Sequence, residues 1–226
     1  MRTRKNRDPL WFLLGATVVV IVVALLPFGW ALVYPIRLFV TFIHEGGHAI
    51  AAILTLGQVE RLHVFLDASG ETLTRGGFPL AIASAGYLTS TAFGAALLIL
   101  GSYTTRAKAA LTACAGVVLL LTAFLAGDWI TWVMGILLAS GLAVVAILFN
   151  PELAHFFLSF LAVQCCLNAF LDLRTLFVLS TSTTVHSDAV TMQQMTMVPA
   201  TVWAVSWMVI SLLALVVALR SYVRHV

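Results

Sequence analysis

The stretch "TFIHEGGHAIAAILTLG", residues 41–57, places two histidines and a glutamate in a segment that is otherwise typical of an apolar membrane helix. An ionisable side chain at the centre of a bilayer costs about 2.5–3.5 kcal/mol on insertion scales. His44, Glu45 and His48 therefore need a partner that offsets this cost, such as a metal ion or a water-filled cavity. For this reason the segment is a candidate functional site.

The spacing of the two histidines indicates which partner to expect. An α-helix brings His44 and His48 onto one face, one turn apart, where two imidazoles can bind one Zn²⁺ at about 2.0–2.1 Å. In an HExxH sequence the glutamate is not a ligand but the general base that takes a proton from a metal-activated water. The alternative is a structural role, with both histidines bonded to carbonyl groups and Glu45 paired with Arg37. Metal binding accounts for all three polar residues together, so we favour it.

A catalytic zinc usually has three protein ligands and one open position, so a third ligand should come from elsewhere in the chain. Asp172 interrupts an apolar run that continues to Leu179, which would place its carboxylate inside the membrane layer. It could instead pair with Arg174 or cap a helix end. Asp188 is the alternative ligand, although it follows a serine- and threonine-rich stretch and would more often be a helix N-cap or a solvated loop residue. We therefore expect Asp172 as the third ligand, with Asp188 as the alternative.

The composition predicts an integral membrane protein. The 226 residues are 62% hydrophobic and 9% charged, whereas soluble domains are about 45–50% apolar and about 25% charged. Basic residues cluster before the first apolar run, in "MRTRKNRD", so the positive-inside rule places the N-terminus in the cytoplasm. The net charge of +3 lies largely at the two ends, and nucleic acid is not an expected partner. The three cysteines fall in apolar runs without CxxC spacing and are predicted to be buried free thiols.

Apolar runs near or above about 18 residues predict an all-α polytopic fold with about six to seven transmembrane helices in a single domain, residues 1–226. The expected helices are 10–33, 35–56, 78–101, 107–126, 129–149, 152–179 and 198–219, with a turn between two of them at Gly127-Asp128. His63 and His155 are expected to be structural. The polar stretch 57–77 alternates apolar and polar residues around the turn sequence "DASG", which predicts a short β-hairpin after the HExxH helix. A plain exposed loop is the alternative for this stretch.

Four features together resemble the site-2 protease family of intramembrane zinc metalloproteases, in particular its M50B-like bacterial branch. They are "HEGGH" on a predicted transmembrane helix, the short β-like segment, "IASAGYLTSTAFGAALL" and the distant "NAFLD". The resemblance implies zinc bound by His44, His48 and Asp172, with Glu45 as the catalytic base. It also implies that Asn168 helps to polarise the scissile carbonyl.

The same resemblance implies that segment 59–75 binds an unfolded substrate by strand addition, with Val64, Phe65 and Leu66 as substrate contacts. The "SAGYLTS" helix would pack beside the active site. We therefore expect a zinc-dependent intramembrane endopeptidase of the bacterial plasma membrane, whose partners are the lipid bilayer and a transmembrane protein substrate. The alternative is a catalytically silent M50-like scaffold or a small ion-handling transporter.

Overall fold

The computed structural model describes residues 29–101, 103–179 and 187–224, together with Gly15, Val18, Val19, Val22 and Leu26. For Trp30, Leu32, Thr104 and residues 166–179 only the backbone is described. The elements follow in the order α2 (Gly29–Leu54), β1 (Gln58–Val64), β2 (Gly70–Arg75), α3 (Pro79–Gly101), the 3-10 turn η1 (Thr104–Arg106), α4 (Ala107–Leu125), α5 (Trp129–Leu148), α6 (Pro151–Leu179), α7 (Asp188–Thr196) and α8 (Ala200–Arg224).

Four of the described helices, α3, α4, α5 and α8, are long and apolar enough to cross a membrane. Large apolar side chains such as Phe124, Ile147 and Leu213 remain exposed on them, as expected for surfaces that face hydrocarbon. The predicted count of six to seven spans is not confirmed. Most of the predicted helix 10–33 lies outside the described residues, and neither α2 nor α6 is among the four.

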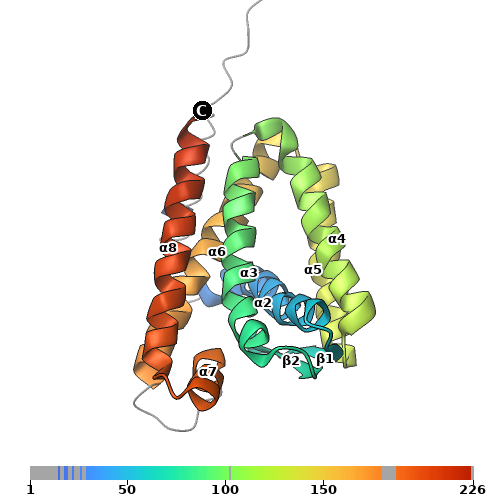
Figure 1. The fold of residues 1–226 in the computed structure, drawn as a ribbon. Coiled ribbons are helices and arrows are strands. Elements are labelled where there is room, and N and C mark those ends of the chain that lie inside the picture. Colours follow the sequence, from blue (N-terminus) through green and yellow to red (C-terminus); the bar gives the residue numbers. More distant parts are fainter. Residues whose placement is uncertain are drawn as a thin grey trace, which may run out of the picture.

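Helix α2, which carries the HExxH sequence, crosses the other helices near one end of the molecule (Figure 1). The prediction of a helix boundary at Tyr34-Pro35 was wrong, because α2 continues through Pro35. Proline removes the amide that would bond to the carbonyl of Ala31 and costs about 3 kcal/mol in a helix interior. Phe39 and Phe42 lie fully buried in the core just beyond it, and this packing offsets the local cost.

The predicted β-hairpin is confirmed, with β1 and β2 antiparallel and Leu62 opposite Thr72. Its turn is closed by the Asp67 carboxylate, which accepts hydrogen bonds from the amide and hydroxyl of Ser69. Hydrogen bonds join it to one face of α2: the Tyr34 hydroxyl donates to the Leu66 carbonyl at 2.8 Å, and the Thr41 hydroxyl donates to the Ala68 carbonyl at 2.7 Å. The hairpin is thereby fixed beside the HExxH sequence.

The second edge of β1 is covered by the turn between α4 and α5. The Gly127 amide donates to the Leu62 carbonyl at 2.9 Å, and the Val64 amide donates to the Thr131 hydroxyl at 2.9 Å. Asp128 is the N-cap of α5, as predicted for this turn, and its carboxylate also bonds to His63. The helical hairpin α4–α5 therefore supports the β-hairpin from the side away from β2.

Two further structural predictions are confirmed within the described residues. His155 is buried, and its Nε2 bonds to the carbonyl of Gly101 at the end of α3. Cys114 is a buried free thiol and Cys165 is buried, whereas the side chain of Cys166 lies outside the described residues.

Helix α3 packs closely against α2, as predicted for the "SAGYLTS" segment. A Cβ at Gly47 of α2 would lie 2.8 Å from the Ala85 carbonyl oxygen and 2.8 Å from the Thr89 side chain. Only glycine permits this approach, so the backbones of the two helices come together next to His48.

Candidate metal centre

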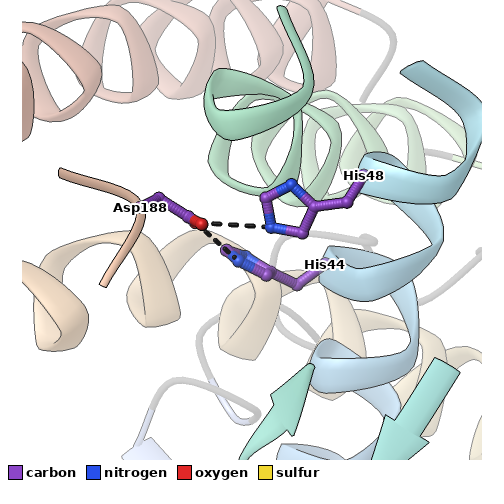
Figure 2. A group of neighbouring side chains, drawn as sticks. All are labelled: His44, His48 and Asp188. Atoms are coloured by element: carbon purple, nitrogen blue, oxygen red, sulfur yellow. Dashed lines mark hydrogen bonds and ion pairs between the residues drawn. The ribbon is translucent and has the colours of Figure 1, made fainter. Parts of the chain in front are cut away.

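The two histidines of α2 and the carboxylate of Asp188 meet at one point. Figure 2 shows both imidazoles pointing from successive turns of α2 towards Asp188, which comes from a different element. The Asp188 Oδ2 atom lies 3.1 Å from Nε2 of His44 and 3.3 Å from Nε2 of His48. The donor atoms of the three residues all lie within 4.8 Å of one another. This convergence brings Asp188 to His44, which lies 144 positions before it in the sequence, and to its neighbour His48.

A hydrogen bond to the backbone of α3 determines which nitrogen of His48 faces Asp188. Its Nδ1 lies 2.6 Å from the carbonyl oxygen of Ile82, which can only accept, so Nδ1 carries a proton and donates it. Nε2 faces the Asp188 carboxylate at 3.3 Å, donates to it when protonated, and is the nitrogen that would bind a metal once its proton has left. Metal-binding histidines commonly make this second hydrogen bond, which fixes both the tautomer and the ring orientation.

Aromatic contacts hold the ring of His44. It packs edge-on against Tyr87 of α3, with ring centroids 4.9 Å apart and an interplanar angle of 89°. Tyr87 in turn stacks on Trp207 of α8 at 4.9 Å. Both imidazoles are thus positioned from α3, one by a backbone carbonyl and the other by an aromatic ring.

Asp188 is the first residue of α7, and the docking of this short helix sets its position. Ser187 is the N-cap, accepting a hydrogen bond from the Val190 amide. Ala189 and Met192 of α7 are buried in a small core that also contains Trp207 of α8. The expectation that Asp188 would be an N-cap or a solvated loop residue was therefore wrong.

The Asp188 carboxylate is ionised in this environment. Burial alone raises the pKa of the carboxyl group, but hydrogen bonds from His44 and His48, together with their charge, outweigh burial and hold the pKa well below its ordinary value. The site thus presents one negative charge to two ring nitrogens.

Glu45 points to the β-hairpin and not into this group of donors. Its side chain is buried, and its Oε2 accepts a hydrogen bond from the Thr72 hydroxyl at 2.7 Å. A Cβ at Gly70 of β2 would lie 2.8 Å from Oε1, so the hairpin leaves just enough room for the carboxylate. Among the described residues, the convergent metal-type donors are the two histidines and Asp188, without Glu45. This arrangement is consistent with a role for Glu45 other than that of a ligand.

The preferred third ligand, Asp172, lies in α6 with Asn168, and both side chains lie outside the described residues. Their distances from the histidines are therefore untested, and their roles stay predictions. The described carboxylate that meets the histidines is that of the alternative residue, Asp188.

The predicted substrate contacts lie at the closed end of the hairpin. Val64 is buried, whereas Phe65 and Leu66 are exposed. The Phe65 amide donates to the Ser69 carbonyl at 2.9 Å, and the amide of Val64 and the carbonyl of Leu66 are also hydrogen-bonded, as described above. Contact of these three residues with a substrate stays a prediction.

Sequence reasoning did not identify Thr72, Ile82 or Tyr87 as neighbours of the centre. The contact from Ile82 is made by a backbone carbonyl, which leaves no signal in the sequence. Thr72 and Tyr87 lie in segments for which we predicted contact with the site, but without naming these residues.

The donor set fits zinc. Two imidazole nitrogens and one carboxylate oxygen are ligand types that Zn²⁺ prefers, and three protein ligands leave a fourth position open, as in catalytic sites. The hydrogen bond to the Ile82 carbonyl is independent support, because it engages Nδ1 of His48 and directs Nε2 to the same point as His44 and Asp188.

Apolar helices long enough to cross a bilayer, arranged around two histidines and an aspartate, define an integral membrane protein with a candidate metal centre. The family model described as Peptidase M50B-like matches residues 14–218, and the chain belongs to this family, which is of the membrane metalloprotease type. The match includes both α2 and α7 and confirms the family resemblance seen in the sequence. Comparison with curated proteins and with solved structures gave no match.

Proposed function

We propose that the protein is a zinc-dependent intramembrane endopeptidase that cleaves membrane-embedded protein segments. The observation that carries this proposal is the convergence of His44, His48 and Asp188 beside Glu45, in a chain of the M50B-like family. We assign Asp188 as the third ligand in place of the initially preferred Asp172. The centre uses side chains from two elements that the helices α3 and α8 hold together.

Zinc bound by these residues supplies Lewis-acid chemistry, which lowers the pKa of a water molecule and polarises a carbonyl group. Glu45 accepts the proton of the attacking water and passes it to the leaving amine. The hydrogen bond from Thr72 holds Oε2 and leaves Oε1 as the proton acceptor. The hairpin thus orients the base, while α3 and α7 orient the ligands.

The low exposure of the three donor side chains favours a substrate helix that unwinds before it is cleaved. The side chains of His44, His48 and Asp188 are 16%, 8% and 23% exposed, so solvent reaches the donors only over a small area. A peptide bond inside an intact helix is shielded by its own side chains and cannot approach such a recessed site. An extended segment can approach the site, so we infer that the substrate helix unwinds locally before cleavage.

The test compares wild type with Glu45→Gln and His44→Ala in zinc content and in cleavage of a model transmembrane substrate in proteoliposomes. We expect Glu45→Gln to keep about one zinc and lose turnover, because the base is not a ligand. His44→Ala should lose both. Glu152→Gln, the same chemical change at an exposed position in the first turn of α6, is the matched control and should behave as wild type.

Unchanged cleavage by Glu45→Gln would refute the assignment of the base. Stoichiometric zinc in wild type without cleavage of any transmembrane substrate offered would favour the catalytically silent scaffold.

A further inference from the structure

Helix α3 faces the two ring nitrogens of the centre through a glycine. A Cβ built at Gly86 would lie 2.4 Å from Nε2 of His44 and 2.5 Å from Nε2 of His48. Its third neighbour would be Cε1 of His44, at 2.6 Å. Carbon atoms do not approach non-bonded neighbours so closely, so the space in front of both nitrogens stays open only because residue 86 has no side chain.

Neither imidazole can move aside without losing a contact that holds it. The His48 ring is bonded through Nδ1 to the carbonyl of Ile82, which lies one turn before Gly86 on the same helix. The His44 ring lies between Tyr87 and the Asp188 carboxylate. A side chain at position 86 would therefore break the arrangement of both rings.

The built Cβ position is not itself a metal position, because it lies only about 1.5 Å from the Cα of Gly86. Its closeness to both Nε2 atoms shows that the two rings lie against the backbone of α3. Non-bonded carbon contacts are near about 3.5–4.0 Å, so a methyl group at position 86 has no room beside the rings as they stand.

We propose that Gly86 is a positioning residue for the two metal ligands: its missing side chain lets both imidazoles lie against α3 with their Nε2 atoms turned to one point. This inference rests on the proposed zinc centre. A side chain at position 86 would push both rings out of this arrangement, so that their nitrogens no longer meet at the ion.

A comparison with Gly47 separates this role from ordinary helix packing. A Cβ at Gly47 would meet the Ala85 carbonyl and Thr89, which belong to the contact between α2 and α3. The three nearest neighbours of a Cβ at Gly86 are all imidazole atoms. Gly47→Ala should therefore loosen the helix pair, whereas Gly86→Ala should block the donors.

The experiment uses the full-length protein in detergent, stripped of metal and titrated with zinc against a chromophoric chelator. Wild type should bind about one zinc, and Gly86→Ala should bind it at least about 100-fold more weakly, the upper end of losses seen when residues that orient metal ligands are changed. Gly101→Ala, on the same helix, is the control, because a Cβ there meets no atom closer than 3.9 Å. It should bind zinc as wild type does.

Thermal unfolding gives the second measurement. Alanine is a better helix former than glycine, which offsets the hydrogen bond to the Ile82 carbonyl that a displaced His48 ring loses. Metal-free Gly86→Ala should therefore unfold near the temperature of metal-free wild type and gain no stability from added zinc. Metal-free Gly47→Ala should unfold earlier.

Zinc affinity of Gly86→Ala equal to that of wild type would overturn the inference and leave the proposed function standing. A metal-free Gly86→Ala protein that is as unstable as Gly47→Ala, or that fails to fold, would overturn it as well, since packing would then explain the glycine. Absence of zinc binding in wild type would instead refute the proposed function.

Discussion

Removal of the Asp188 carboxylate tests our proposal that Asp188, and not the Asp172 favoured by the sequence, is the third zinc ligand. Asp188 supplies one of the three convergent donors and the only negative charge among them. Its Oδ2 lies 3.1 and 3.3 Å from the two ring nitrogens, so it faces both ligands and not just one. We expect Asp188→Ala to lose most of the zinc.

The size of the loss follows from the number of ligands. Zinc bound by four protein ligands contributes about 10–16 kcal/mol in small structural sites, or roughly 2.5–4 kcal/mol for each ligand. Since about 1.4 kcal/mol corresponds to a factor of ten, loss of Asp188 should weaken zinc binding roughly 10²- to 10³-fold. Asp188→Asn retains an oxygen of similar position but not the charge, so its affinity should lie between those of wild type and Asp188→Ala.

The assay is a competition titration of metal-free protein in detergent, with Asp172→Asn as the comparison. If Asp188 is the third ligand, Asp172→Asn should bind zinc close to wild type, whatever its effect on cleavage. Wild-type affinity in Asp188→Ala, combined with a large loss in Asp172→Asn, would refute our assignment and return the role to Asp172.

Two further predictions concern the β-hairpin. Thr72→Val removes a hydrogen bond to the Glu45 carboxylate and should slow cleavage roughly 10- to 100-fold at unchanged zinc content. Thr74→Val, on the same strand, is the control, and equal slowing by both variants would contradict a specific role for Thr72. Burial raises the pKa of Asp128, but hydrogen bonds from Thr131 and His63 outweigh it and hold the pKa below its ordinary value of 3.8. Because the folded-state pKa is lowered, the ionised carboxylate stabilises the fold at pH values above 3.8, and this stability is lost as the pH falls through the folded-state pKa. Asp128→Asn should therefore have a lower Tm than wild type at pH 7, and its Tm should fall less steeply than that of wild type below about pH 4. Curves of Tm against pH that run parallel for the two proteins would contradict this.

Elements with a strong local pattern were predicted well. The predicted helices 78–101, 107–126 and 129–149 agree closely with α3, α4 and α5, and the alternation in 57–77 predicted both strands of the hairpin. These features depend on short-range periodicity and on turn residues such as Asp67 and Asp128, whose side chains bond to amides only two or three residues away.

Predictions that depended on the balance between local preference and packing were less successful. The ranges 10–33 and 35–56 predicted a helix boundary at residue 34, but α2 continues through Pro35, and the residues that follow it are buried. Helix α7 was missed altogether, because its nine residues are too few and too polar to give a clear helical period, and contacts with α3 and α8 stabilise it.

The sequence by itself determined the class of the protein and two of the three donors of its candidate centre. Composition requires a membrane, and the four-residue spacing of His44 and His48 places both imidazoles on one face of any helix that forms there. Only the tertiary structure brought the Asp188 carboxylate to them, because its position depends on where α7 docks. The polar sequence around Asp188 suggested a position far from a membrane helix, yet α2 crosses the molecule near the same end at which α7 lies (Figure 1). Contacts between residues 140 positions apart follow from how whole helices pack, and no local pattern encodes them.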